Sequence, residues 1–191
     1  TKRSPISISP PLNASEERLR IPVKHKPLIQ PIFQKKVDDH NNWRRNHLKT
    51  LKHTFHKFPY AYYYLPLLEE VYQSSTLNLS QILISLIGQL AGWLHLNIKI
   101  HTASESSFVT DHHAFIHFWF LELNAKSYVT SDTIFKNRWL NKTALQEKKI
   151  NISYFNDFPE YHILQSYRKK SIINFLMQFG PEAGYLIKQY M

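Results

Sequence analysis

The sequence contains no cysteine, and glycine is scarce, with only 4 among 191 residues. Without cysteine, disulfide-built folds, thiol nucleophiles and cysteine-ligated zinc are excluded. The P-loop and the dinucleotide-binding fingerprint both need closely spaced glycines, and neither motif occurs. Acidic residues are also few, 14 in all, and no two of them have the setting of a glycosidase acid pair. The composition therefore excludes thiol chemistry and cysteine-ligated zinc, and the chain shows neither glycine-rich nucleotide motif and no evident glycosidase acid pair.

Long hydrophobic runs are absent as well. The longest mostly apolar stretch, residues 77–96, includes asparagine, glutamine, serine and histidine, which makes it too polar for a bilayer span of about 20 apolar residues. The basic start Thr1-Lys2-Arg3 is followed by prolines rather than by the apolar core of a secretory signal. We therefore expect a cytoplasmic protein without a transmembrane segment. Since 43% of the residues are hydrophobic, the chain has enough apolar side chains for a packed core.

Positive charge is abundant and unevenly placed. The formal net charge is +10, and residues 1–60 hold 13 Lys and Arg against 4 Asp and Glu. Residues 61–191 are nearly neutral. Such asymmetry predicts an anionic partner for the first third of the chain, which could be a nucleic acid, a phosphate-bearing substrate or an acidic membrane surface.

The hydrophobic pattern predicts a single α/β domain over residues 1–191, with a small parallel or mixed sheet flanked by helices. Residues 1–18 are expected to form an irregular arm, and two short strands broken by proline are expected within residues 19–37. Helices are expected from the capping residues 38–42 to residue 58, and over residues 61–73, 79–96, 114–123, 139–149, 171–179 and 182–191. Strands are expected at 97–101, 127–130 and 150–155, and strands alternating with helices indicate parallel pairing.

One face of the first predicted helix is basic. The cations Arg45, Lys49 and Lys52 recur at helical spacing opposite an apolar face, with Arg44 beside them. This face could hold phosphates, or it could be an ordinary solvated helix face. Tyr60 opens a tyrosine-rich run that could stack on bases or sugar rings, although packing between two helices is the favoured interpretation.

Candidate acid–base groups are few. His47 falls on the apolar face of the same helix, where it could be a general base facing a pocket or a buried histidine with satisfied hydrogen bonds. Ser131 and Asp132 follow a predicted strand, at the sheet edge where α/β proteins usually bind ligands. His113 and His117 have the spacing of metal ligands on a helix but lack an accompanying Glu or Cys. We therefore expect no metal site and no cofactor.

Four segments, in order, carry a resemblance. They are Arg20-Ile21-Pro22-Val23-Lys24 after an earlier Lys2-Arg3-Ser4; Trp43-Arg44-Arg45-Asn46-His47 with Phe58-Pro59-Tyr60; Ala125-Lys126-Ser127-Tyr128-Val129-Thr130-Ser131; and Pro159-Glu160-Tyr161 with Ser171-Ile172-Ile173-Asn174 and Phe179-Gly180-Pro181-Glu182. Together these segments resemble the WbqC-like protein family, with Trp43, Pro59, Tyr161, Gly180, Pro181 and Glu182 as the residues of the shared motifs.

The chain departs from the family pattern at four places, one of which is the replacement of an Arg- and Asn-rich segment by residues 5–13. Family members open with a further strand and loop that has no counterpart here, so the N-terminal segment of the family is expected to be missing. The Asp of the motif in the C-terminal part of the family is Asn174 in this chain. A Gly that follows the family's third motif gives way to Ser131-Asp132.

The resemblance implies a bacterial protein of surface-polysaccharide (O-antigen) biosynthesis. It implies a glycine or acyl transferase that acts on an amino sugar linked to a nucleotide or a lipid. On that hypothesis His47 is the base and Ser131 and Asp132 lie at the reacting end of the sheet. The residues expected to hold phosphate or substrate are Lys24, Arg44, Arg45, Lys49, Lys52 and Tyr60. Two alternatives stay open: a nucleic-acid-binding module, which we consider less favoured, and a degenerate family member without activity.

Overall fold

The structure is a computed structural model of the 191-residue chain. It describes residues 7–8, 17–24, 27, 30–102, 104, 118–130, 142–147, 149–154, 166–167 and 170–189. The chain divides into two compact units, and each is considered by itself. The first unit comprises residues 1–100 and 159–191, and the second comprises residues 101–158. That the whole chain forms one domain stays a prediction.

The second unit contains a βαβ arrangement. Strand β3 (Ser127–Thr130) pairs in parallel with β4 (Asn151–Tyr154), and α6 (Lys142–Glu147) lies between them in sequence. Parallel strands require such a crossover connection. This unit has a small hydrophobic core, in which the buried Leu145 and Ile150 pack against Phe120, Tyr128 and Ile152. This parallel pair with its helix confirms the predicted α/β class.

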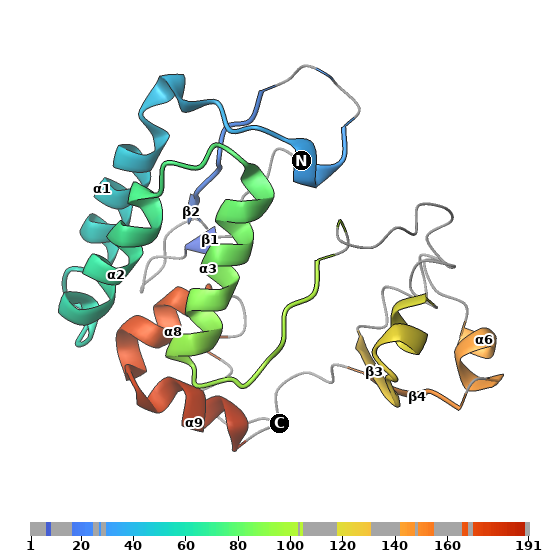
Figure 1. The fold of residues 1–191 in the computed structure, drawn as a ribbon. Coiled ribbons are helices and arrows are strands. Elements are labelled where there is room, and N and C mark those ends of the chain that lie inside the picture. Colours follow the sequence, from blue (N-terminus) through green and yellow to red (C-terminus); the bar gives the residue numbers. More distant parts are fainter. Residues whose placement is uncertain are drawn as a thin grey trace. The chain divides into compact units, whose positions relative to one another are not determined.

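The first unit is built mainly of helices (Figure 1). α1 (Trp43–Phe55), α2 (Ala61–Gln73) and α3 (Leu79–Trp93) follow one another, and α8 (Ile172–Phe179) and α9 (Glu182–Lys188) come from the C-terminal part. β1 (Ser7–Ile8) and β2 (Glu17–Arg18) form a short antiparallel pair. α1 and α2 are neighbours that run side by side, as an antiparallel pair joined by a short turn must.

The predicted apolar face of α1 is the face that is buried. Trp43, His47, Leu51 and Phe55, four residues apart in each case, are all buried. The capping residues act one step earlier than expected, because the Asp38 carboxylate caps the 3₁₀ turn η2 (Asp39–Asn41). Asn42 then takes the left-handed conformation, with φ 47°, and α1 begins at the next residue.

Three predicted strands are wrong. Residues 97–101 form no ladder in the described part of the chain, because alternation alone supplies no partner strand. Ile98 and Ile100 are exposed. Residues 29–37 were expected to form a strand, but Pro31 precedes a 3₁₀ turn, η1 (Ile32–Gln34). Only single bridges remain there, from Lys36 to Asn78 and from Val37 to Val23. The second bridge is also all that remains of the strand predicted near residues 19–24.

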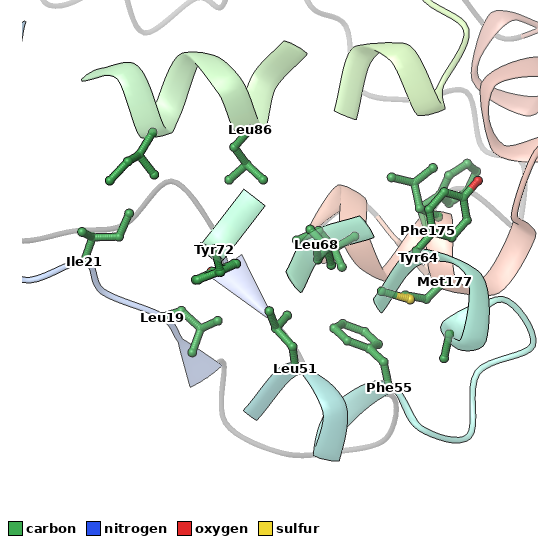
Figure 2. Close-up of a cluster of buried hydrophobic side chains, with 14 of the residues drawn as sticks. Leu19, Ile21, Leu51, Phe55, Tyr64, Leu68, Tyr72, Leu86, Phe175 and Met177 are labelled. Carbon is green, nitrogen blue, oxygen red and sulfur yellow. The ribbon is translucent and has the colours of Figure 1, made fainter. Parts of the chain in front are cut away.

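One core joins the five α-helices that the structure describes in the first unit. Figure 2 shows side chains from α1, α2, α3 and α8 meeting the segment that contains Leu19 and Ile21. Leu51, Phe55, Leu68 and Met177 have no exposed surface. Burying a side chain of this kind contributes about 1.5–3 kcal/mol, so this contact among helices distant in sequence is the main stabilising feature of the unit.

The start of α2 is joined to the end of α8. The Tyr60 backbone N–H donates to the Met177 carbonyl at 3.0 Å. Gly180, with φ 57°, ends α8, and a Cβ placed on it would lie 2.5 Å from the Tyr60 ring. Only glycine satisfies both the backbone angle and this contact. The two segments are therefore fixed to each other at one point.

Asn174 has an unusual place in α8. It has no exposed surface, and neither its amide nitrogen nor its amide oxygen has a hydrogen-bond partner among the described residues. A buried amide without partners costs about 1–3 kcal/mol. α8 nevertheless stays buried along most of its length, because four apolar residues surround this position in sequence.

Candidate functional site

A groove of about 660 Å³ lies on the surface between α1 and α2. Its walls carry four cations and two carboxylates, with hydroxyl and amide groups at the end of α2. The lining residues are Asp39, Arg44, Arg45, Leu48, Lys49, Lys52, Glu69, Tyr72, Gln73, Ser74 and Ser75. All of them belong to the first unit. The groove is therefore a positively charged, polar site on the helical pair.

Arg44 is part of the wall rather than a free cation. Its guanidinium donates to the Tyr72 carbonyl at 2.9 Å and to the Thr76 carbonyl at 2.8 Å. Its Nε donates to the Asp39 carboxylate at 3.3 Å, and the same carboxylate accepts a hydrogen bond of 2.8 Å from the Trp43 indole. Carbonyls at the end of a helix lack partners within it, so Arg44 satisfies them and ties α1 to the end of α2.

A second ion pair joins α1 to α2 across the groove. The Lys52 ammonium lies 2.7 Å from the Glu69 carboxylate, and both side chains are partly exposed. Exposed pairs of this kind contribute roughly 0–1 kcal/mol. Lys52 can therefore be released from Glu69 at small cost when a stronger anion enters.

Arg45 and Lys49 are the two cations of the groove with no ion-pair or hydrogen-bond partner within the described residues. They lie four residues apart on α1, so their side chains project from one face, about 6 Å apart at Cβ. Both residues are exposed. These two cations are available to a ligand. Among the predicted phosphate-binding residues, they are the ones that best fit that role.

His47 lies behind the groove and not in it. It is 6% exposed, its Nε2 is 3.1 Å from the Arg20 carbonyl, and its Nδ1 is 3.3 Å from the Tyr72 hydroxyl. The Arg20 carbonyl can only accept, so Nε2 carries the hydrogen and Nδ1 accepts from Tyr72. Burial lowers the pKa of His47 to about 4, against a smaller opposing effect of the Arg20 hydrogen bond.

These contacts are those of a buried, satisfied histidine, which was the alternative weighed against a general base. Burial also raises the pKa of the Tyr72 hydroxyl, which the charge of Arg44 opposes. Trp43 and Tyr72 each pack a ring against His47, with centroids 5.1 and 5.7 Å away. His47 therefore fixes the back of the groove wall through Tyr72, and its role as a base stays a prediction that this geometry does not favour.

The remaining predicted site residues lie elsewhere. Tyr60 contacts Gly180, outside the groove. Lys24 is exposed, with its backbone bonded to Lys36, and it does not line the groove. Ser131, Asp132 and Tyr161 lie outside the described residues, as do His113 and His117. In the described part of the chain, no group of three or more His, Asp or Glu could hold a metal ion.

The groove also contains residues that the sequence did not single out. Glu69, Gln73, Ser74 and Ser75 come from α2 and the loop after it. The one available signal was the spacing of Glu69 and Gln73, four residues apart on a predicted helix, which places them on one face. Nothing in that spacing indicates that the face turns toward α1.

Within the described residues, no helix is long and apolar enough to cross a bilayer.

The family comparison agrees with the motifs. The model of the WbqC-like protein family matches residues 3–185. The chain belongs to the WbqC-like family. The comparison with curated proteins found no match, and neither did the comparison with solved structures.

Three motif segments of the WbqC-like family have clear places in this fold. Trp43, Arg44 and His47 form and brace the wall of the groove. Pro59 and Tyr60 open α2, and Gly180, Pro181 and Glu182 join α8 to α9, so these segments meet where the Tyr60 ring covers Gly180. The first motif therefore shapes a candidate site, whereas the second pair of motifs holds the helices that carry it.

Proposed function

We propose that this WbqC-like protein binds an amino sugar linked to a nucleotide or a lipid, and that it serves surface-polysaccharide assembly as a glycine or acyl transferase. The observation that carries the binding part is the groove between α1 and α2, in which Arg45 and Lys49 lie side by side without described partners. Two adjacent cations at one edge suit a pyrophosphate or two neighbouring phosphates.

The groove supports more than charge recognition. Gln73, Ser74 and Ser75 supply neutral donors and acceptors at one end, and side chains of that kind bind sugar hydroxyls. Leu48 and Tyr72 also line the groove. Arg44 and Asp39 hold this wall in place before a ligand arrives, which lowers the entropic cost of binding.

The proposed glycine or acyl transfer rests on the family resemblance. The amine of the sugar would attack an activated acyl carbon, and the tetrahedral intermediate would expel the donor's activating group as the amide forms. The reaction needs a base for the amine proton and hydrogen-bond donors for the developing oxyanion. Glu69 is a carboxylate in the groove, and it becomes free to accept a proton when Lys52 turns to an anionic ligand. Ser131 and Asp132, which lie outside the described residues, stay predicted catalytic residues.

Calorimetric titration with uridine diphosphate tests the binding part. We expect binding by the wild-type chain and an affinity loss of at least tenfold in Arg45→Ala and in Lys49→Ala, because a hydrogen bond to a charged group contributes about 1.5–3 kcal/mol. Lys99→Ala removes an exposed lysine that does not line the groove, so it should bind like the wild type. Equal affinity in all four proteins would refute the groove as the site.

The nucleic-acid alternative is tested with the same proteins. A protein held mainly by phosphate contacts loses affinity steeply with salt, with log K falling linearly against log salt. Tight binding of duplex DNA, with a steep salt dependence and no response to uridine diphosphate, would replace the present proposal. Weak DNA binding that uridine diphosphate displaces would support it.

A further inference from the structure

The outward face of α1 extends beyond the groove. Arg45, Lys49, Lys52, His53 and His56 are all exposed. At 3.6 residues per turn they share one side of the helix, opposite the buried Trp43, His47, Leu51 and Phe55. Residues 43–58 contain no Asp or Glu. The charged side chains that α1 itself places on this side, Arg45, Lys49 and Lys52, are therefore all positive, and Lys57 continues the series into the turn.

An exposed aromatic ring lies next to this basic side. Tyr62, in the first turn of α2, is 78% exposed. It is separated from Glu69 by seven residues and from Gln73 by eleven, so the three share one stripe of α2. Glu69 and Gln73 line the groove that α1 borders. Tyr62 therefore points to the same side of the helical pair as the cations of α1.

We propose that this face, here called the hairpin face and formed by Arg45, Lys49, His56, Lys57 and Tyr62, docks on the surface of an anionic lipid bilayer. Each cation near an anionic membrane surface contributes about a fivefold gain in partitioning. A tyrosine ring is amphipathic and is favoured at the level of the headgroups. The face thus combines the two interactions that hold a protein on a bilayer without crossing it.

The layout of the hairpin face favours a bilayer over a nucleic acid. Its arginine and lysines run from the first turn of α1 (Arg45) through its middle (Lys49) to the turn after it (Lys57), and the exposed ring lies beyond their end, in the first turn of α2. A bilayer offers charge over a plane with an apolar layer beneath, and this arrangement matches it. Binding of single strands without sequence preference typically uses several rings that stack successive bases along a charged path, whereas this face has one ring at one end.

The inference goes beyond the proposed function and does not need it, because docking is measured without any sugar ligand. The full chain is sedimented with vesicles of phosphatidylcholine alone and with vesicles containing one third phosphatidylglycerol, at low and at high salt. We expect binding only to the anionic vesicles, and release at high salt. An absence of binding to phosphatidylglycerol vesicles at low salt would overturn the inference, as would equal binding to both kinds of vesicle.

Two variants and two matched controls locate the surface. Lys57→Ala should lower the partition coefficient about fivefold, and Tyr62→Ser should lower it severalfold. Lys99→Ala and Tyr185→Ser remove an exposed lysine and a 60% exposed tyrosine outside α1 and α2, so they should bind like the wild type. Losses of the same size in the controls would overturn the inference.

Lys57 and Tyr62 do not line the groove. Their variants should therefore keep wild-type affinity for uridine diphosphate while losing vesicle binding, and that result would support docking by the hairpin face. Vesicle binding by a wild-type chain that does not bind uridine diphosphate would refute the proposed function and leave the docking inference standing. If the chain binds single-stranded DNA but does not sediment with the vesicles, the docking inference is overturned in favour of nucleic-acid binding.

Discussion

His47 should make a large contribution to the pH dependence of the free energy of unfolding. Its folded pKa, lowered by burial to about 4, lies below the ordinary value of 6.5. The unfolded chain therefore binds a proton at this residue over a pH range in which the folded chain does not. Because the folded pKa of this base is depressed, its neutral form is favoured by folding, and stability is lost as the pH falls from 6.5 toward 4.

The size of the effect follows from these two values. Between pH 7.5 and pH 5, the linkage relation gives a loss of about 2 kcal/mol in the free energy of unfolding from this one residue. Protonation of Nδ1 would also turn a donor toward the Tyr72 hydroxyl, which now donates to that nitrogen. The Tyr72 hydroxyl can rotate to accept from the protonated Nδ1, and its own hydrogen then needs another acceptor.

The assay is urea denaturation of the wild type and of His47→Gln at the two pH values. The glutamine variant should be less stable at both, but its stability should fall by about 2 kcal/mol less on acidification. His53→Gln changes an exposed histidine on the same helix and should keep the wild-type pH dependence. The reasoning is refuted if His47→Gln shows the full wild-type dependence. If that variant does not fold, NMR titration of the His47 ring in the wild type decides, since a midpoint near the ordinary value would contradict the burial argument.

Two further predictions concern α8. Gly180→Ala places a methyl group against the Tyr60 ring and strains a positive φ, so urea denaturation should show a loss of about 2–4 kcal/mol. Gly92→Ala, where no atom lies within 4 Å of the added carbon, should instead gain about 0.5–1 kcal/mol, and similar effects at both glycines would contradict the packing described. Asn174→Leu should raise the free energy of unfolding by about 1 kcal/mol, because a buried amide that has no partner among the described residues is replaced by an apolar side chain of similar volume. A clear loss of stability in that variant would show that the amide is engaged.

The helical part of the fold was largely predictable because periodicity reports directly on burial. The expected bounds of one helix, Ala61–Gln73, and of one strand, Ser127–Thr130, agree with the structure. Strands depend on a partner that periodicity does not specify, so residues 97–100 were wrongly predicted. At residues 32–34, Pro31 led into a 3₁₀ turn instead of a strand.

The sequence predicted the positive charge of the candidate site, but it did not predict which cations have hydrogen-bond or ion-pair partners. Arg45 and Lys49 were expected as cations of one helix face, and they are the groove cations without described partners. Arg44 belongs to the same charge cluster in sequence, yet its hydrogen bonds go to carbonyls at Tyr72 and Thr76, distant in the chain. Which cation is held and which is free depends on contacts between helices, and helix periodicity carries no information about these.

The bond between Tyr60 and Met177 has a consequence for how the chain folds. The helices that carry the groove, α1 and α2, leave the ribosome long before α8 does, yet their buried side is completed by Ile173, Leu176 and Met177. Until α8 is made, the apolar side of this helical pair can be covered only in part, by α3 and by the segment that contains Leu19 and Ile21 (Figure 2). Contacts between residues so distant in sequence form slowly. The nascent protein therefore passes through a stage in which the hydrophobic side of α1 and α2 is partly exposed, which makes that stage prone to aggregation and a natural target for a chaperone.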